Sequence, residues 1–341
     1  MLMKVESANE NDAHDSSIET EKNDSSKPTL RNMHVTHFPQ MSLFLTDLVL
    51  PDDGEQREKK IIVTYQEPPV TENKSRRTLE VPLEPDLDGL EKIPVMMHQS
   101  PMVGYIMDKK YNDWFSECFG FPVVLAYTGL NRRRVLGSMN PNIARKSSDK
   151  GGWLSTLTGY VPLLGAGATQ EPDEEILTFA DCASYLVVNE ESVKDVASRF
   201  QSGQGKVEVT RFRPNVVIGG AESAWEEDFW SELNLATEDN SQDVQLILTS
   251  NCVRCRSLDV DFETGDFHKA EDGIVYKKLN KDRRVDRGAK YKPVFGRYGF
   301  MKDDVVARVR VGDAVTVSKR AEERTVFGEF CLWMSFVDML C

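Results

Sequence analysis

The sequence predicts a mainly β protein with some α-helix, in which a β-barrel or sandwich follows a smaller α+β domain. The chain has 341 residues, 40% of them hydrophobic, which is enough to bury the cores of two modest domains. Two segments repeat apolar residues at helical spacing. After residue 176, short β-prone segments alternate with glycine turns, and this pattern is typical of barrels and sandwiches.

The first 128 residues divide into a polar arm and an α+β region. Residues 1–30 are rich in Glu, Asp, Asn, Ser and Lys, so we predict a disordered acidic arm that cannot offset its ordering entropy by burial. Residues 31–128 form the smaller predicted domain. There, residues 41–50 and 61–65 indicate a hairpin, residues 102–120 have helical spacing, and residues 121–127 indicate a strand.

A linker and a β-rich domain follow. Residues 129–175 hold three consecutive arginines and many Gly and Ser residues, which indicates a loop or linker. Residues 176–318 form the predicted β-rich domain, and residues 319–341 are an unassigned tail. Asn189 is the expected N-cap of a helix over residues 190–200. Strands are expected at residues 184–188, 207–217, 243–249, 257–262 and 305–317.

The composition argues against several classes of protein. The net charge of −13 argues against general nucleic-acid binding, which needs a basic surface. No apolar run reaches the ~20 residues of a transmembrane helix, and the polar start resembles neither a secretory nor a mitochondrial signal. Six scattered cysteines do not form a disulfide scaffold, so a reducing compartment, by default the cytoplasm, is expected.

The most distinctive motif is Asn251-Cys252-Val253-Arg254-Cys255. A structural zinc site needs four ligands, and no second cysteine pair exists. A thioredoxin-like dithiol normally opens a helix, whereas a predicted strand and a glycine turn follow here. Two interpretations stay open. One thiolate could bind a soft metal centre with Arg254 nearby to favour the ionised sulfur, or both cysteines are small buried hydrophobic residues.

A second motif, Thr210-Arg211-Phe212-Arg213-Pro214-Asn215, alternates basic and aromatic side chains. On an extended segment both arginines would share one face and could present guanidinium groups to a phosphate or carboxylate. The alternative is that these arginines form ordinary surface ion pairs with the acidic residues at 226–228. The aromatic residues of that acidic segment are expected to pack in the core. Those carboxylates could instead orient Arg213.

Taken in order, these segments resemble the MOSC family, the domain found in molybdenum cofactor sulfurases and mitochondrial amidoxime-reducing components. The resemblance is carried by the two motifs above together with residues 179–181, 185–192, 225–230, 259–265, 293–298 and 311–315. It implies a MOSC-type β-barrel over residues 176–318. Residues from about His34 onward resemble part of the family's N-terminal MOSC-associated α+β domain.

The resemblance also implies a function. The expected cofactor is a molybdopterin-type molybdenum cofactor, with Cys255 as metal ligand and catalytic residue. Arg213 and Asn215 would hold the pterin phosphate and ring, Arg254 and Asn251 would line the same pocket, and Cys252 is the competing ligand. The implied reaction is reduction of N-hydroxylated small molecules with electrons from a separate partner protein.

An alternative function follows from the sulfurase branch of the resemblance. In that branch the domain would carry sulfur or handle the cofactor, acting in trans with a pyridoxal-phosphate-dependent cysteine desulfurase through Cys252 or Cys255. The resemblance to amidoxime-reducing components also makes mitochondrial association an expectation beside the cytoplasmic default.

Overall fold

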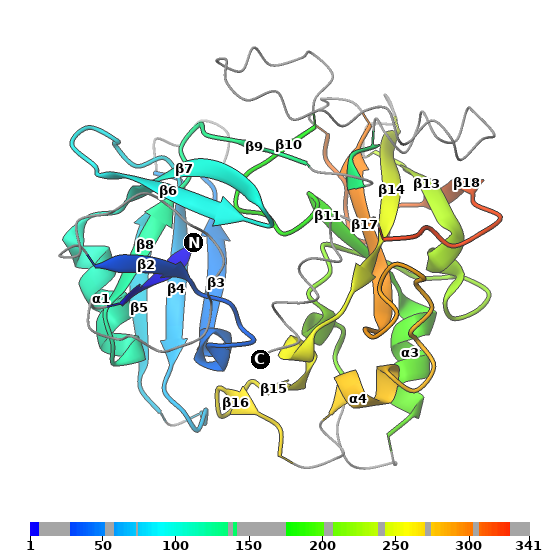
Figure 1. Cartoon of the computed structure of the whole chain (residues 1–341), viewed down its shortest axis with the longest axis horizontal. Helices are drawn as coiled ribbons and strands as arrows, with labels where there is room; N and C mark the ends of the chain where they lie inside the picture. The colour runs from blue at the N-terminus through cyan, green and yellow to red at the C-terminus, as the bar shows by residue number, and fades with distance from the viewer. Residues whose placement is uncertain are drawn as a thin grey trace. The chain divides into compact units, whose positions relative to one another are not determined.

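The computed structural model describes residues 1–6, 28–51, 58–72, 74–135, 139–141, 175–200, 207–237, 243–269, 274–302 and 307–327. The chain divides into two compact units (Figure 1). Unit 1 comprises Met1–Val95, Met102–Asn131 and Val260–His268, and unit 2 comprises Met96–Pro101, Arg132–Asp259 and Lys269–Cys341.

Unit 1 contains two antiparallel sheets and one longer helix. The first sheet has the order β2-β1-β8-β7-β6 and the second the order β3-β4-β5. Their bounds are β1 Leu2–Glu6, β2 Thr29–Asn32, β3 Phe44–Val49, β4 Lys60–Gln66, β5 Arg76–Pro82, β6 Lys92–Met97, β7 Ser100–Ile106 and β8 Val123–Tyr127. The remaining elements are the 3-10 helix η1 Pro39–Leu43, the helix α1 Lys109–Phe119, and the short strands β15 Val260–Asp261 and β16 Asp266–Phe267.

The helix α1 closes the core of unit 1. Its apolar face buries Tyr111 and Phe115, and Phe44 stacks on Phe119 with ring centroids 4.7 Å apart. Gly120 ends the helix with a φ of 76°, a left-handed conformation that glycine adopts without steric cost. The predicted hairpin is confirmed, because β3 and β4 pair in antiparallel register. The strand predicted over residues 121–127 is confirmed as β8.

Two predictions for unit 1 are wrong. Residues 2–6 of the predicted disordered arm form β1, because Met3 is buried and the segment pairs with both β2 and β8. The first part of the helix predicted over residues 102–120 is the strand β7, in which Ser100, Met102 and Gly104 alternate inward. Residues 7–27 of the predicted arm lie outside the described residues.

Unit 2 is organised around a six-stranded sheet with the order β12-β11-β17-β14-β13-β18. Only the β11–β12 pair of this sheet is parallel. The bounds are β11 Tyr185–Asn189, β12 Val216–Ile218, β13 Trp230–Leu235, β14 Val244–Val253, β17 Val294–Met301 and β18 Val315–Arg320. Smaller elements are β9 Arg133–Arg134, β10 Ile176–Leu177, the helices α3 Glu190–Ser198 and α4 Val275–Leu279, and the 3-10 helices η4 Val209–Phe212, η5 Glu226–Phe229 and η6 Arg256–Asp259.

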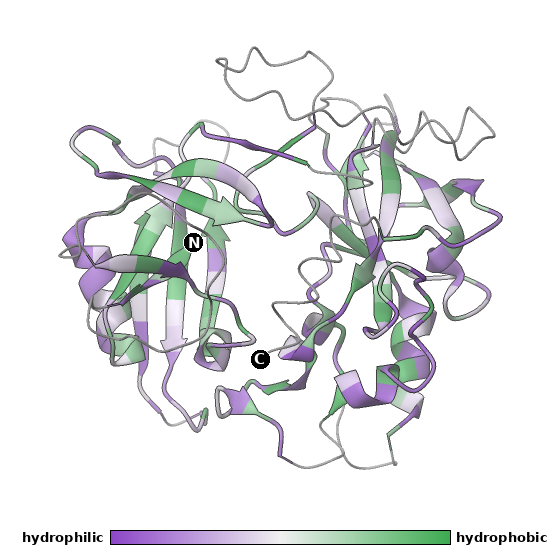
Figure 2. Ribbon diagram, in the orientation of Figure 1, coloured by the Kyte–Doolittle hydropathy of each residue, from purple (hydrophilic) through white to green (hydrophobic). Residues whose placement is uncertain are grey.

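The central strands of the six-stranded sheet, β11, β17 and β14, are buried on both faces. Val187 and Val188 are adjacent and fully buried, yet they belong to two different hydrophobic clusters. Because successive strand residues point to opposite faces, the two clusters cover opposite sides of the sheet. The helices α3 and α4 contribute Val196 and Leu279 to the Val188 side. Figure 2 shows hydrophobic residues along β14.

The helix predicted over residues 190–200 is confirmed as α3, and the Asn189 side chain caps it by accepting a hydrogen bond from the Glu191 backbone N–H. The continuous strand predicted over residues 207–217 is wrong, because residues 209–212 form η4 and only residues 216–218 are extended. Residues 257–259 of the strand predicted over residues 257–262 belong instead to η6. The structure confirms the mainly β class.

The predicted linker and tail are only partly described. Arg133 is buried and donates hydrogen bonds to the Thr178 and Ala180 carbonyls, so residues 133–134 are an ordered part of unit 2 instead of a solvated loop. In the tail, residues 319–320 belong to β18, and the backbone N–H of Phe327 donates to Asp286. Residues 136–138 and 142–174 of the linker, and 328–341 of the tail, lie outside the described residues.

Candidate functional site

Arg254 connects the two predicted motifs. Its side chain is buried, with Nη1 3.1 Å from the Cys252 Sγ and Nη2 donating to the Phe212 carbonyl oxygen at 2.8 Å. Its backbone N–H donates to the Pro293 carbonyl. One guanidinium therefore joins the cysteine segment at the end of β14 to the Arg213 segment after η4, although about forty residues separate them. A lysine could not span both acceptors with a fixed fork.

The end of β14 is irregular where the motif begins. Asn251 pairs with Arg297, but the next paired residues are Val253 and Val294, so the register shifts around Cys252. Such bulges redirect side chains at sheet edges and next to binding sites. Gly296 lies opposite this shift with a φ of 82°, and a Cβ there would meet the Val187 carbonyl oxygen at 2.9 Å. Only glycine fits without displacing β11.

The two cysteines of the motif occupy different environments. Cys252 is 3% exposed, and burial raises the pKa of its thiol although Arg254 and Tyr298 oppose the shift. Cys255 lies beyond the strand, is only partly buried, and has its Sγ 3.0 Å from the Ser257 Oγ. Cys255 is therefore the thiol that a ligand can reach, while Cys252 is held inside the core.

Arg213 is turned out of the core by its neighbour. Phe212 is fully buried and stacks on Phe295, with ring centroids 3.9 Å apart and planes at 13°. Arg213 follows in a left-handed conformation with a φ of 56°, and it is exposed. The predicted extended geometry, with Arg211 and Arg213 on one face, is therefore wrong: the Arg211 guanidinium donates to the Leu258 carbonyl.

The acidic residues 226–228 do not orient Arg213. Glu226 pairs with Arg320, and Asp228 accepts hydrogen bonds from Arg283 and Arg324. The nearby aromatic residues lie as expected in or against the core, where Trp230 is 1% exposed. The charge of Arg213 acts instead on Asp181.

Asn215 and Asn251 have structural partners. The Asn215 Oδ1 accepts a hydrogen bond from the Leu186 backbone N–H at 2.8 Å, and its own N–H donates to the Leu186 carbonyl at 2.9 Å. Asn251 faces away from Cys252: its Nδ2 donates to Asp286 and its Oδ1 accepts from Arg297 at 2.7 Å. The structure therefore places Asn251 in a separate buried network, apart from Arg254 and Cys252.

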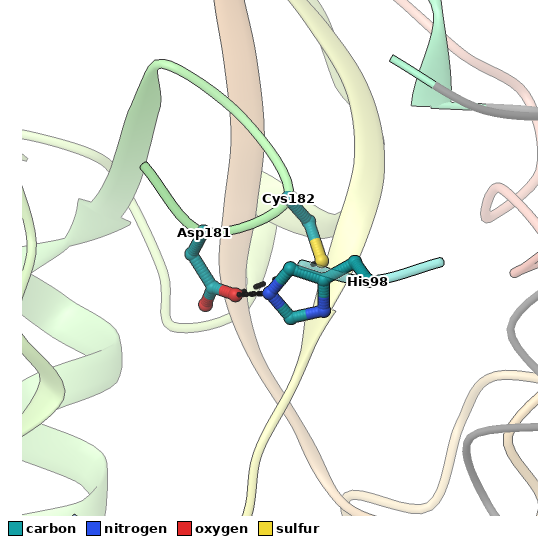
Figure 3. A group of neighbouring side chains, drawn as sticks. All are labelled: His98, Asp181 and Cys182. Atoms are coloured by element: carbon teal, nitrogen blue, oxygen red, sulfur yellow. Dashed lines mark hydrogen bonds and ion pairs between the residues drawn. The ribbon is translucent and has the colours of Figure 1, made fainter. Parts of the chain in front are cut away.

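Three further residues adjoin the site that the sequence did not assign. The Asp181 carboxylate accepts from the Tyr298 hydroxyl at 3.1 Å and lies 2.7 Å from the His98 Nε2 (Figure 3). The protein atoms around Asp181 would raise the pKa of its partly exposed carboxyl, but the hydrogen bonds from His98 and Tyr298 and the charge of Arg213 hold this pKa well below its usual range. Burial raises the pKa of Tyr298, which also contacts Cys252.

Asp181 and Tyr298 both lie in segments that carry the family resemblance, so the sequence contained a signal for them. His98 lies in the turn between β6 and β7, within the part of the chain that groups with unit 2. No local pattern distinguishes it, because its approach to Asp181 depends on a long-range contact.

Comparison with known proteins assigns the second half of the chain to a domain family. Residues 174–316 match the model of the MOSC domain. The chain contains a MOSC domain. This confirms the resemblance, and the mainly β architecture around the six-stranded sheet is consistent with a MOSC β-barrel.

Three relatives illustrate the extent of the match. Mitochondrial amidoxime-reducing component 1 of Homo sapiens is 32% identical over 145 residues, covering 42% of this chain and 39% of that protein. Mitochondrial amidoxime reducing component 2 of Rattus norvegicus is 32% identical over 140 residues, covering 41% and 38%. A molybdenum cofactor sulfurase of Oryza sativa is 26% identical over 245 residues, covering 68% and 25%. The chain thus spans less than half the length of these relatives.

One further structural finding concerns membranes. Among the described residues, no helix has both the length and the apolar character needed to cross a bilayer.

Proposed function

We propose that the MOSC domain binds a molybdopterin-type molybdenum cofactor, with Cys255 as the metal ligand and Arg213 as a contact to the cofactor phosphate. The observation that carries this proposal is the Arg254 bridge, which holds the cysteine motif against the segment that presents Arg213. The names of the relatives, amidoxime-reducing components and a molybdenum cofactor sulfurase, support the cofactor class.

The residues present fit such a group. Cys255 offers a partly exposed thiol, and the cationic side chain of Arg254 interacts electrostatically with it. Thiolate is a suitable ligand for a soft metal centre, and a guanidinium forms strong hydrogen bonds with phosphate oxygens. Arg213 is exposed and turned outward by the buried Phe212.

The other predicted site residues take supporting roles in this proposal. Cys252 and Arg254 position the Cys255 turn from inside the core. Asn215 fastens the Arg213 segment to β11, and Asn251 steadies β14 through Arg297. These residues would act by orienting the ligands, which explains why their side-chain groups are already occupied by protein partners.

The reaction that we propose is reduction of N-hydroxylated small molecules, with electrons from a separate donor protein. The bound cofactor would supply the redox and oxo chemistry. The chain would contribute binding, orientation and a carboxylate, Asp181, which stays ionised between His98 and Tyr298. We propose the cytoplasm as the place of action, with association with mitochondria as the alternative, and cell fractionation separates the two.

The decisive experiment measures molybdenum and pterin in the full chain purified from a host that makes the cofactor. Cys255→Ala should lose most of the metal, whereas Cys118→Ala, which removes a partly buried thiol of unit 1, should retain it. Arg213→Ala should weaken pterin retention roughly tenfold to 100-fold, the effect of one charge-assisted contact. A folded wild-type protein without molybdenum, or equal metal in both cysteine variants, would refute the proposal.

A second candidate function is sulfur transfer, and the alignment with the rice sulfurase over 68% of this chain favours it. The accessible Cys255 would take the outer sulfur atom from the persulfide of a pyridoxal-phosphate-dependent cysteine desulfurase, which returns to the thiol form. Mass spectrometry after incubation with a desulfurase and cysteine should then show one added sulfur on Cys255. Its absence would exclude this role.

A further inference from the structure

We propose that His98, Asp181 and Cys182 form a binding site for a divalent transition-metal ion, with Zn²⁺ as the best fit. An imidazole nitrogen, a carboxylate oxygen and a thiol sulfur all lie within 4.8 Å of one another (Figure 3). These three donor types are the usual zinc ligands, and three protein ligands leave a fourth position for water or a substrate. The molybdenum proposal uses Asp181 as an ionised carboxylate but not as a metal ligand, so Zn²⁺ at Asp181 would compete with that role. The two tests remain distinguishable, because zinc binding is followed at Cys182 and molybdenum content at Cys255.

The distances between the three ligand atoms would suit a zinc ion if the imidazole and the carboxylate moved slightly apart. The Asp181 Oδ1 is 2.7 Å from the His98 Nε2 and 3.7 Å from the Cys182 Sγ. Zinc bonds of about 2.0–2.3 Å in tetrahedral geometry place neighbouring ligand atoms roughly 3.3–3.8 Å apart. The sulfur–oxygen distance already falls in this range. The imidazole and carboxylate would separate by about half an ångström, exchanging their hydrogen bond for two metal bonds.

The turn that carries His98 is held in an unfavourable conformation. His98 and Gln99 both have left-handed backbones, with φ values of 47° and 62°. Two-residue hairpin turns of this kind favour Asn and Gly, because other side chains are strained there. Among the described residues, the buried His98 Nδ1 has no hydrogen-bond partner. The ring is therefore held by its Nε2 contact with Asp181, and a ligand role for Nε2 would explain why the strained turn places the imidazole beside that carboxylate.

The Asp181 carboxylate is oriented and exposed in a way that suits cation binding. Its Oδ2 accepts from the Tyr298 hydroxyl, and this leaves Oδ1 directed at the cluster. Its side chain remains 62% exposed, so an ion can reach it from solvent. Tyr298 would be the outer hydrogen-bond partner that orients a ligating carboxylate.

The surrounding charges are compatible with the ion. An ionised carboxylate, a thiolate and a neutral imidazole balance Zn²⁺. Arg133 donates to the carbonyls of Ala180 and Asp181, which fixes the loop, and its charge also interacts with Cys182. Together with Arg213, this cation would repel a loosely held ion, so binding would depend on direct bonds from all three ligands.

The test uses the full chain, stripped of metal with a chelator, and titrates it with Zn²⁺ by calorimetry and with Co²⁺ by absorption spectroscopy. We expect one Zn²⁺ per chain and a sulfur-to-cobalt charge-transfer band. Cys182→Ala and His98→Ala should each lower the affinity at least about 100-fold, beyond the tenfold to 100-fold loss typical of outer partners. Tyr298→Phe should fall within that smaller range.

Cys118→Ala is the matched control and should bind like the wild type, because its thiol lies in unit 1. Circular dichroism checks folding, and Cys182→Ser replaces any alanine variant that does not fold. The proposal is overturned if the wild type binds no Zn²⁺, if Cys182→Ala and Cys118→Ala bind equally, or if the cobalt band is lost only with Cys252→Ala or Cys255→Ala.

Discussion

Replacing Arg254 with methionine is expected to lower the free energy of unfolding by about 2–3 kcal/mol and to separate the two motifs of the site. Methionine keeps much of the side-chain volume but removes every donor. The Phe212 carbonyl, which now accepts from Nη2 at 2.8 Å, would become an unsatisfied acceptor in the core. Such a group costs about 1–3 kcal/mol, and the lost contact to the Cys252 sulfur adds to this.

The hydration of the guanidinium opposes this loss of stability. A buried guanidinium has given up its hydration, so removing it recovers part of that cost. The expected decrease is therefore nearer to the cost of the orphaned carbonyl than to the sum of all broken bonds. Arg254→Lys should recover little, because an ammonium group lacks the planar fork that reaches both acceptors.

The assay is urea denaturation of the full chain, followed by tryptophan fluorescence, with Arg256→Ala as control. Arg256 lies in the next turn and is exposed, so its removal should change the unfolding free energy by less than about 0.5 kcal/mol. If Arg254→Met destabilised the protein by less than about 1 kcal/mol, or no more than Arg256→Ala, the bridge would not hold the two segments together.

Two further substitutions test the interior of unit 2. Burial raises the pKa of Glu227 to about 7, above its ordinary value of 4.5. Below about pH 4.5 the carboxyl is protonated in both the folded and the unfolded chain, so it does not destabilise the fold. As the pH rises through 7, the buried carboxyl must ionise or hold a proton that the unfolded chain has already released, and the free energy of unfolding falls. Glu227→Gln should therefore be more stable than the wild type by about 3 kcal/mol at pH 8 and equal to it at pH 4 in urea titrations; the same difference at both pH values would contradict this. Asn215→Ala should lower the unfolding free energy by about 1–2 kcal/mol, because the Leu186 N–H loses its acceptor, whereas Asn215→Asp keeps that oxygen. Calorimetry showing equal melting temperatures for the two Asn215 variants would refute the assigned hydrogen bond.

Features that depend on local periodicity could be predicted from the sequence. The β3–β4 hairpin and the helix α3 with its Asn189 cap were expected from patterns a few residues long, and both are confirmed. The mainly β class followed from the density of short strands. Each of these depends on neighbours in the chain, so no tertiary information was needed.

The errors arise where tertiary contacts override local preference. Residues 2–6 were included in a polar arm, yet β1 is stabilised by pairing on both sides with distant strands. The sequence predicts an extended segment around Arg213. In the structure, Phe212 is buried against Phe295 at the end of a 3-10 turn, and Arg213 follows in a left-handed conformation. A contact between residues so far apart in sequence leaves no trace in local periodicity.

The choice between Cys252 and Cys255 shows most clearly what spacing cannot supply. A pair separated by two residues allows either thiol to be the ligand. The register shift at the end of β14 decides how each one is presented, since it leaves Cys252 in the core against Arg254 and places Cys255 beyond the last strand pair. The same shift separates Asn251 from Cys252 and directs it to Arg297. One backbone irregularity therefore divides the four polar residues of the motif into a buried support and an accessible thiol, which is the division that the proposed metal ligand requires.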